Sequence, residues 1–385
     1  MTRVLITSSA LSELERTEQP GALRAAFRPL RRGFLLAADL DGREADRLGS
    51  ELDGALADRP VSVPVVGDAV VTGEPMDYHG QGAPVPTRRA LRQRVGGNDV
   101  STGEGVLVGV VDTGVSPHPW LAGGYLSSVD DFEPSPDTAA ARERQQAGHG
   151  TFVAGLVLQQ APAAGVWVER ALELDGSGLV SRVAEAALQL AARGVDVLNL
   201  SLGCWATDRE AAEVVRALVR ELHAVNPEMV VVAAAGNLSD DDRTGLFWPA
   251  ADPGVVSVGA VASPVSTEWS QWSNRGPWVD LAAPGEHLLS TYLVARLQGT
   301  GGPQRYHGWA TWSGTSFAAA VVSGAIARLM TGPQRLSAQQ AVARLRAGQD
   351  CRARTRAHGD TPSVPVVDLA TWPEQEAARE QRAAS

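Results

Sequence analysis

The sequence has 385 residues, which is enough for two domains or for one large α/β domain with an appendage. Its 34 basic residues against 44 acidic ones give a formal charge of -10, which argues against a protein that binds nucleic acid by neutralising phosphates. All the basic residues are arginine, so mechanisms that need a lysine Schiff base or a Ser-Lys dyad are excluded.

The first 73 residues are expected to form a small α/β domain of their own. Their apolar patterns predict a helix over 43–56 and strands over 3–7, 33–38 and 61–71. Residues 74–104 are rich in Gly, Pro and Arg, a composition typical of an extended and accessible linker.

Neither a targeting segment nor a membrane span is predicted. The apolar run near Met1 has three residues, whereas a secretory signal needs about 7–15 and a membrane span needs about 20. A cytoplasmic protein is therefore expected, with export by another route left open. The two cysteines, Cys204 and Cys351, are too few for a disulfide scaffold or a thiolate zinc site. They form either one bridge or two small buried hydrophobic positions.

Residues 105–370 are predicted to form the larger domain. Continuous apolar runs, typical of strands buried on both faces, cover 106–112, 165–172, 195–202, 229–235 and 255–261. Helical spacing over 181–193 and 208–224 alternates with these runs, and Ser181 and Asp208 are suited to cap the two helices. This alternation predicts an α/β fold with a doubly wound, mostly parallel sheet, in which ligands bind where the strands end.

Two later features complete the expected organisation. Residues 288–296 and 306–311 are predicted to form a hairpin that leads into another helix. Residues 371–385 are expected to be a charged, solvated tail.

Two polar residues early in the larger domain are candidates for chemistry. Asp112 ends the first strand before a glycine turn, where a carboxylate either orients a ligand or a histidine or is simply solvated. His149 lies between two glycines, so its ring is expected to be uncrowded and open to a cleft, as a general base requires. A histidine packed in the core is the alternative.

Two further candidates follow later in the chain. Ser316 begins an apolar helix, where a serine most often caps the helix. It can instead be a nucleophile, because the helix start favours a developing negative charge. Asn237 follows an apolar strand and either offers a side-chain amide donor or forms an asparagine turn.

Together these residues resemble a known family. Their order is Asp112, His149, Asn237 and Ser316, and the subtilisin-like serine peptidases share the order Asp, then His, then Ser. The resemblance extends over residues 100–335 and includes the segments 118–121, 199–203, 248–250, 256–260 and 281–285. It implies a subtilisin-like fold and an endopeptidase that acts on a peptide or protein substrate without a cofactor.

The resemblance also implies roles for residues. Ser316 would attack the peptide carbonyl, His149 would transfer the proton and Asp112 would fix the imidazole tautomer. The Asn237 amide and the backbone N–H of Ser316 would hold the oxyanion. The substrate would add a strand beside residues 200–203. Small residues, with room between them for a large apolar side chain, would wall the first pocket: Ser201, Leu202, Gly203, Ala234, Ala235 and Gly236. Cys204 beside this pocket is either a modifiable thiol or an inert neighbour.

The N-terminal domain resembles the inhibitory propeptides of the family in size and position. It is therefore expected to bind its own catalytic domain, and either to be cut off in the linker or to stay attached as a regulatory domain. Calcium sites are common in the family, but 240–242 is predicted to be a solvated loop and no metal is expected.

The sequence departs from the family pattern at Phe152, where a second His is usual, and at Phe317 and Ala320, where Met and Pro are usual. Maturation of a dedicated precursor peptide is the expected role. Two alternatives stay open: a catalytically silent scaffold that binds peptides, and a peptide ligase or cyclase that uses the same acyl-enzyme.

Overall fold

A computed structural model of the chain describes most of the larger domain and parts of the N-terminal region. The described residues are 2–7, 28–29, 35–40, 66–67, 70–72, 84–88, 90–91, 101–124, 132–133, 146–206, 209–237, 246–299, 302–331 and 334–369. Several sequence predictions lie outside them: the helix over 43–56, the loop at 240–242, the cap at Asp208, the tail over 371–385 and most of the linker.

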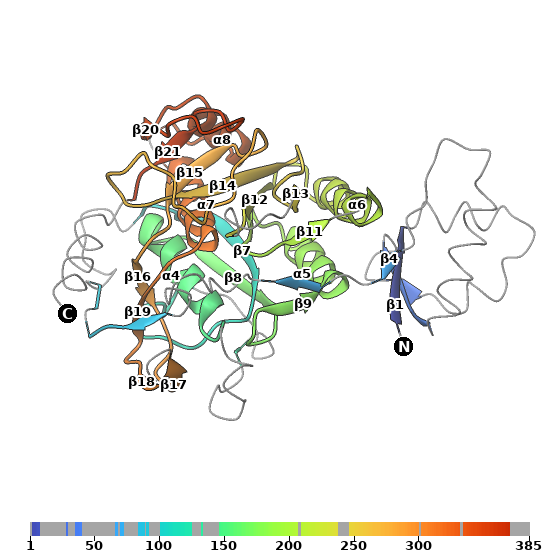
Figure 1. The fold of residues 1–385 in the computed structure, drawn as a ribbon, viewed down its shortest axis with the longest axis horizontal. Coiled ribbons are helices and arrows are strands. Elements are labelled where there is room, and N and C mark those ends of the chain that lie inside the picture. The colour runs from blue at the N-terminus through green and yellow to red at the C-terminus, as the bar shows by residue number, and fades with distance from the viewer. Residues whose placement is uncertain are drawn as a thin grey trace, which may run out of the picture.

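The larger domain is built on an eight-stranded sheet (Figure 1). In spatial order its strands are β20 (Cys351–Arg354), β21 (Pro365–Val367), β15 (Leu281–Pro284), β14 (Val255–Val261), β12 (Val230–Ala234), β10 (Val197–Leu200), β7 (Leu107–Asp112) and β8 (Gly165–Arg170). Neighbours run parallel, except that β20 pairs antiparallel with β21 through a bulge between Cys351 and Ala353. The doubly wound, mostly parallel sheet is thus confirmed.

Helices cover both faces of this sheet. On one face lie α4 (His149–Gln160) and α7 (Thr315–Met330), and on the other lie α5 (Val180–Ala192) and α6 (Arg209–Val225). Alternate residues of a strand point to opposite faces of the sheet. In β12, Val230 and Val232 pack with α4 and α7, while Val231 packs with α5 and α6. Both faces are therefore buried, which explains why the strands are continuous apolar runs. A further helix, α8 (Ala338–Arg346), packs against α7.

The order of the strands creates a switch point between β7 and β10. From β7 the chain passes through α4 to β8 on one side, and then through α5 back to β10 on the other side of β7. At such a point the loops after the two strands diverge and leave a crevice at their carboxyl ends, where α/β sheets bind ligands. Asp112 ends β7 and Ser201 directly follows β10.

Smaller antiparallel sheets accompany the main sheet. β11 (Cys204–Ala206) pairs with β13 (Leu246–Trp248), and β17 (Arg296–Gly299) pairs with β18 (Gly302–Arg305), both antiparallel. β16 (Leu288–Thr291) pairs antiparallel with β19 (Trp309–Trp312), so the hairpin predicted from 288 to 311 is confirmed as two nested strand pairs.

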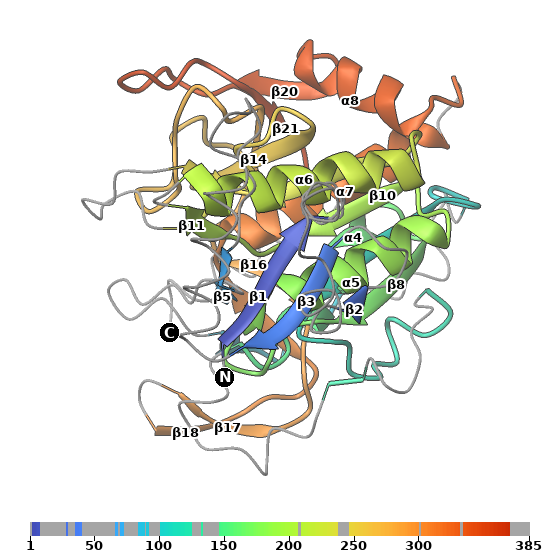
Figure 2. The ribbon, with the colours of Figure 1, turned by 90° about the vertical axis from the view of Figure 1, so that its right-hand side faces the viewer.

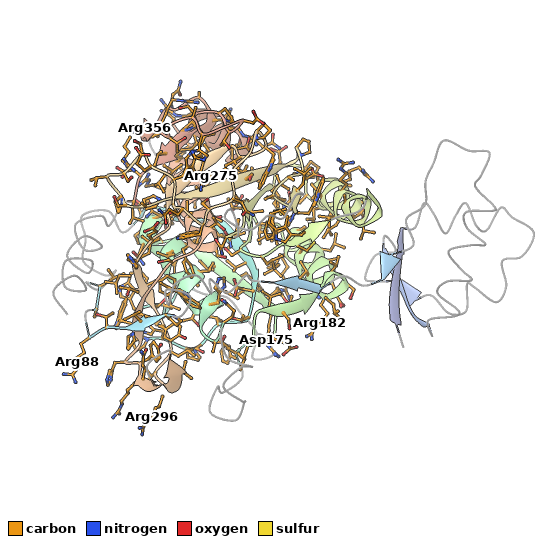
Figure 3. All side chains as sticks on the ribbon, viewed as in Figure 1. Arg88, Asp175, Arg182, Arg275, Arg296 and Arg356 are labelled. Carbon is orange, nitrogen blue, oxygen red and sulfur yellow. The ribbon has the colours of Figure 1, made fainter. Side chains whose placement is uncertain are left out.

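Part of the predicted linker differs from the expectation of accessible chain. β6 (Val85–Pro86) adds to the edge of β19, and the hydroxyl of Tyr306 donates to the carbonyl of Pro84 at 2.6 Å. Leu91 is buried against Leu289 and Trp309. Arg88, between these contacts, points away from the domain (Figure 3). Gly and Pro content indicated extended chain correctly, but extended chain can also pair with an open strand edge.

The N-terminal region contains an antiparallel sheet of β2 (Arg28–Pro29), β3 (Leu35–Leu40), β1 (Thr2–Thr7) and β4 (Val66–Gly67). β1 and β4 lie against α6, and Figure 2 shows β1 and β3 in front of α5 and α6. Beyond this sheet, β5 (Val70–Thr72) pairs antiparallel with β9 (Ser177–Leu179) of the larger domain and lies near β11.

The helix starts show where cap prediction was wrong. α5 begins at Val180 after Leu179, which makes no side-chain cap, so Ser181 lies inside the first turn. The capping box is instead at α8, where Ser337 and Gln340 bond reciprocally to each other's backbone N–H groups. Among the helices in the described ranges, none has the length and apolar composition to cross a bilayer.

Helix α4 is buried throughout and α7 is buried from Thr315 to Ala327, and the two helices pack closely enough to require glycine where they cross. A β-carbon placed on Gly324 of α7 would lie 2.6 Å from both the Val157 carbonyl oxygen and the Gln160 β-carbon of α4. Since the obstruction includes backbone, the helices would have to separate to admit a larger residue.

We expect Gly324→Val to lower the free energy of unfolding by about 1–3 kcal/mol through overpacking. Ala343→Val places the same side chain at an exposed position of α8 and controls for the cost of a β-branched residue in a helix. Urea unfolding compares the two, and equal losses would contradict the close-packing argument.

Candidate active site

A carboxylate and an imidazole meet at the switch point. Asp112 and His149 are buried, and His149 Nδ1 lies 2.8 Å from Oδ1 and 2.9 Å from Oδ2 of Asp112. The backbone N–H of Thr113 donates to the same Oδ1 at 2.7 Å. A β-carbon on Gly150 would lie 3.2 Å from Asp112 Oδ1 and would overlap a nearby carbonyl oxygen, so this position needs glycine. The carboxylate fixes the proton on Nδ1 and leaves Nε2 as the basic nitrogen.

The surroundings of His149 differ from the expected uncrowded ring. The residue is only 3% exposed, and its ring contacts Trp312 edge-on, with centroids 5.5 Å apart, and Phe317 at 5.3 Å. The flanking glycines indicated free space around the ring, but rings from β19 and α7 fill that space. Contact with Phe317 also brings the imidazole to the start of α7.

Ser316 lies in the first turn of α7 and does not cap it. The N-cap is Gly314, which has no side-chain cap. The Ser316 hydroxyl donates instead to the Ser201 carbonyl at 3.1 Å, and the Ser201 hydroxyl donates to the Ser316 carbonyl at 2.8 Å. Within the described part of the chain, no hydrogen bond joins Ser316 to His149.

Asn237 is held by the residue before Ser316. Its Oδ1 accepts from both the backbone N–H and the hydroxyl of Thr315, each at 2.8 Å. The Thr315 hydroxyl in turn accepts from the Gly236 N–H at 3.0 Å. With its oxygen engaged in this way, the amide presents its NH₂ group on the other side, and a β-carbon on Gly314 would lie 3.8 Å from Nδ2. Thr315 was not among the predicted site residues, although it directly precedes the predicted nucleophile.

The six predicted pocket residues lie at the ends of two neighbouring strands. Ser201, Leu202 and Gly203 come after β10, while Ala234 ends β12 ahead of Ala235 and Gly236. Leu202 packs in the core cluster that also contains residues of α5 and α6, and Ala235 packs in a separate apolar cluster. The glycines of the two segments, Gly203 and Gly236, both lie against the Phe247 ring.

Glu133 is a second carboxyl group close to Asp112 and His149, and it was not among the predicted site residues. The Gly148 N–H donates to its Oε1 at 2.7 Å, Ser116 donates to Oε2 at 3.4 Å, and the Thr113 hydroxyl also bonds to it. It therefore ties the residue before His149 to the turn after Asp112. Nothing in the sequence pattern distinguishes Glu133 from the other acids between 130 and 137.

The two cysteines are free, and Cys204 is buried. Burial raises the pKa of the Cys204 thiol to about 11, so it stays protonated near neutral pH. Of the two possibilities for Cys204, the inert neighbour agrees with this environment.

The two aromatic departures from the family pattern contact each other. Phe152 on α4 and Phe317 on α7 have ring centroids 4.5 Å apart, and the Trp312 ring contacts both, at 5.8 Å from Phe152 and 5.2 Å from Phe317. Phe152 and Phe317 therefore form a matched pair at the interface of the two helices.

Comparison with known proteins places this geometry in a family. The family model described as "Subtilase family" matches residues 103–354, more than half of the chain. The chain belongs to the subtilase family. Asp112, His149, Asn237 and Ser316 all lie within the matched segment.

Several known proteins are similar to a large part of the chain. The chain is 34% identical over 257 residues to a thermophilic serine proteinase of Bacillus sp. (strain AK1), covering 63% of this chain and 57% of that protein. It is 35% identical over 240 residues to an intracellular serine protease of Paenibacillus polymyxa, covering 58% of this chain and 66% of that protein. The chain thus spans less than two thirds of each. A solved protease of Pseudoalteromonas arctica PAMC 21717 is 27% identical, with a TM-score of 0.55, covering 73% of this chain and 92% of that one.

Glu133 leads to a prediction about pH. Burial, and to a lesser extent the nearby Asp112 charge, raise the pKa of its carboxyl group from 4.5 to about 8. The folded state therefore holds this proton more tightly than the unfolded chain. Its contribution to stability is complete below about pH 4.5 and is lost as the pH rises toward 8.

Gln at this position is always neutral. We expect Glu133→Gln to make the fall in unfolding free energy between pH 5 and 8 shallower by about 1–3 kcal/mol. Denaturant unfolding at several pH values measures this, with the exposed Glu228→Gln as control. Parallel curves for wild type and Glu133→Gln would refute the assignment.

Proposed function

We propose that the protein is a serine endopeptidase. Ser316 attacks a peptide carbonyl, His149 accepts the hydroxyl proton at Nε2 and returns it to the leaving amine, and Asp112 stabilises the imidazolium. Water then hydrolyses the acyl-enzyme, with His149 as base again. The observation that carries the proposal is the buried contact of 2.8 Å between Asp112 and His149, at the switch point and beside the start of α7.

The start of α7 is suited to stabilise the negative charge that develops on the substrate carbonyl oxygen when Ser316 attacks. The Ser316 backbone N–H lies in the first helical turn, where N–H groups lack helical partners and the helix dipole is positive. The Asn237 NH₂ group is oriented by Thr315, which occupies its oxygen. Two preset donors of this kind stabilise a tetrahedral oxyanion more than they stabilise the planar carbonyl.

The reaction requires one change at Ser316. Its hydroxyl donates to the Ser201 carbonyl in this structure, and rotation about χ1 would release this bond and turn Oγ toward His149. The bond released is a single hydrogen bond, with a net worth of about 1 kcal/mol. A substrate that pairs with the segment at Ser201 would compete for that carbonyl and favour the rotation.

The peptidase proposal predicts an order of losses. Ser316→Ala and His149→Ala should lower kcat by about a million-fold, the scale known for the nucleophile in the relative subtilisin. Asn237→Ala should lower it by about 100- to 1000-fold. Ser363→Ala, outside the site, should leave it unchanged. Hydrolysis of a peptide library is the measurement, and a Ser316→Ala variant as active as wild type would refute the mechanism.

Two further measurements on the same variants separate the alternatives. A fluorophosphonate that labels Ser316 in wild type but not in Ser316→Ala excludes the silent scaffold. Products formed in ¹⁸O-water carry ¹⁸O in the new carboxyl group after hydrolysis, whereas a ligase or cyclase joins the acyl group to an amine.

We propose hydrolysis that matures a dedicated precursor peptide inside the cell, and one of the relatives is named an intracellular serine protease. Cleavage sites in the library identify the precursor sequence.

We also propose that the N-terminal domain binds its own catalytic domain as a propeptide does. β5 pairs antiparallel with β9 and lies near β11, and β1 and β4 lie against α6. Because β11 directly follows the segment 200–203, beside which the substrate would add a strand, an extended segment at this place would hinder substrate binding. Release of such a propeptide needs a cut between β5 and β6. After this cut, β6 would stay paired with β19 as part of the catalytic domain.

This arrangement predicts where the chain is cut. We expect intact-mass and N-terminal sequencing of the wild type to give a new start between 73 and 84, because residues from Pro84 onward are held by Tyr306 and β19. Ser316→Ala should keep Met1. A wild-type protein that keeps Met1 while cleaving peptides would instead support a permanent regulatory domain.

A further inference from the structure

We propose that Phe247 fills the first side-chain pocket beside Ser316 and limits the substrate residue on the acyl side of the cleaved bond to Gly, Ala or Ser. This inference rests on the proposed peptidase function and adds the substrate class. It also replaces the expectation that small wall residues admit a large apolar side chain.

The pocket walls are fixed to the start of α7. On one side, Ser201 exchanges two hydrogen bonds with Ser316, of 2.8 and 3.1 Å. On the other, Gly236 donates to the Thr315 hydroxyl at 3.0 Å. The space between these walls is therefore the space next to the nucleophile, where the side chain preceding the cleaved bond must enter.

The Phe247 ring lies in that space and touches both walls. A β-carbon on Gly203 would lie 2.6 Å from Cζ of Phe247 and closer still to Cε1. A β-carbon on Gly236 would lie 3.1 Å from Cγ and Cδ1 of the same ring. Different atoms of the ring thus approach the two glycines, so the ring spans the gap between the walls.

The two glycines are needed for the Phe247 ring to occupy this position. Alanine at Gly203 would collide with the ring, and Gly236 has a φ of +96°, which other residues rarely adopt. The Asn274 amide also lies against Gly236 and donates to the Ala235 carbonyl at 2.8 Å. It therefore narrows the gap between the two pocket walls further.

The Phe247 ring is also packed against the neighbouring strand β11. Phe247 belongs to β13, whose neighbouring strand β11 places Trp205 directly opposite, and the two rings meet at 5.4 Å and 68°. Phe247 is only 1% exposed. Moving it out of the gap would expose an aromatic ring to water and break its packing, and both changes are unfavourable. A large incoming side chain would have to overcome this cost, whereas a methyl or hydroxymethyl group would not.

The consequence is a size limit. Excess volume in a packed pocket is discriminated against by about 10- to 200-fold for one methylene, so a benzyl group should be rejected at least 100-fold relative to a methyl group. The preference is set by exclusion, because the pocket contributes contact with a small side chain but has no room for a larger one.

The test measures kcat/KM for peptides that differ only in the residue before the cleaved bond, with Gly, Ala, Ser, Val, Leu or Phe at that position. We expect wild type to cleave after Ala at least 100-fold better than after Phe. Phe247→Gly should raise kcat/KM for Phe at least 100-fold while changing that for Ala less than tenfold. Leu246→Ala, on the same strand with a side chain that is 41% exposed, should keep the wild-type profile.

Phe247→Leu provides a milder change if the glycine variant does not fold, and should extend the preference to Val. Labelling of Ser316 by a small fluorophosphonate is measured in every variant, so loss of the peptidase function is seen separately. A labelled wild type that cleaves after Phe as well as after Ala would overturn the inference. A labelled Phe247→Leu with an unchanged profile would do the same.

Discussion

The position of helix α7 determines the geometry of the whole site. Its first turn is joined to two strand ends by side-chain hydrogen bonds, through Ser201 to the end of β10 and through Thr315 to Gly236 and Asn237 after β12. A helix can slide or rotate over a sheet at little cost in apolar burial, whereas these bonds have direction and register. They place Ser316, the proposed oxyanion donors and the proposed pocket walls at fixed distances from one another.

Strand positions and the order of the chemical groups were predictable from the sequence because each depends on local signals. Val255–Val261 is a continuous apolar run, and its observed bounds are those predicted. Asp112 and Ser316 were found because strand ends and helix starts have recognisable neighbours. The doubly wound sheet followed from the alternation of such segments.

What the sequence did not reveal depends on contacts between distant segments. Glu133 accepts a hydrogen bond from Gly148, 15 positions later in the chain, and no spacing rule encodes that meeting. Phe247 directly precedes the family-like segment 248–250 and was not among the predicted site residues, and its proposed role depends on glycines 44 and 11 positions earlier. The linker composition was correct for extended backbone but carried no information on which strand edge it joins. Burial of His149 likewise comes from rings far along the chain.

The outer edge of the main sheet has a further consequence. A parallel sheet leaves unpaired N–H and carbonyl groups on its last strand, and another molecule can pair with them. Here that strand is β20, which runs against its neighbour, contains a bulge and carries Arg352 and Arg354. Irregular spacing and repeated positive charge make it a poor template for a second sheet, so the protein is protected at this edge from growing into fibrils when it is concentrated.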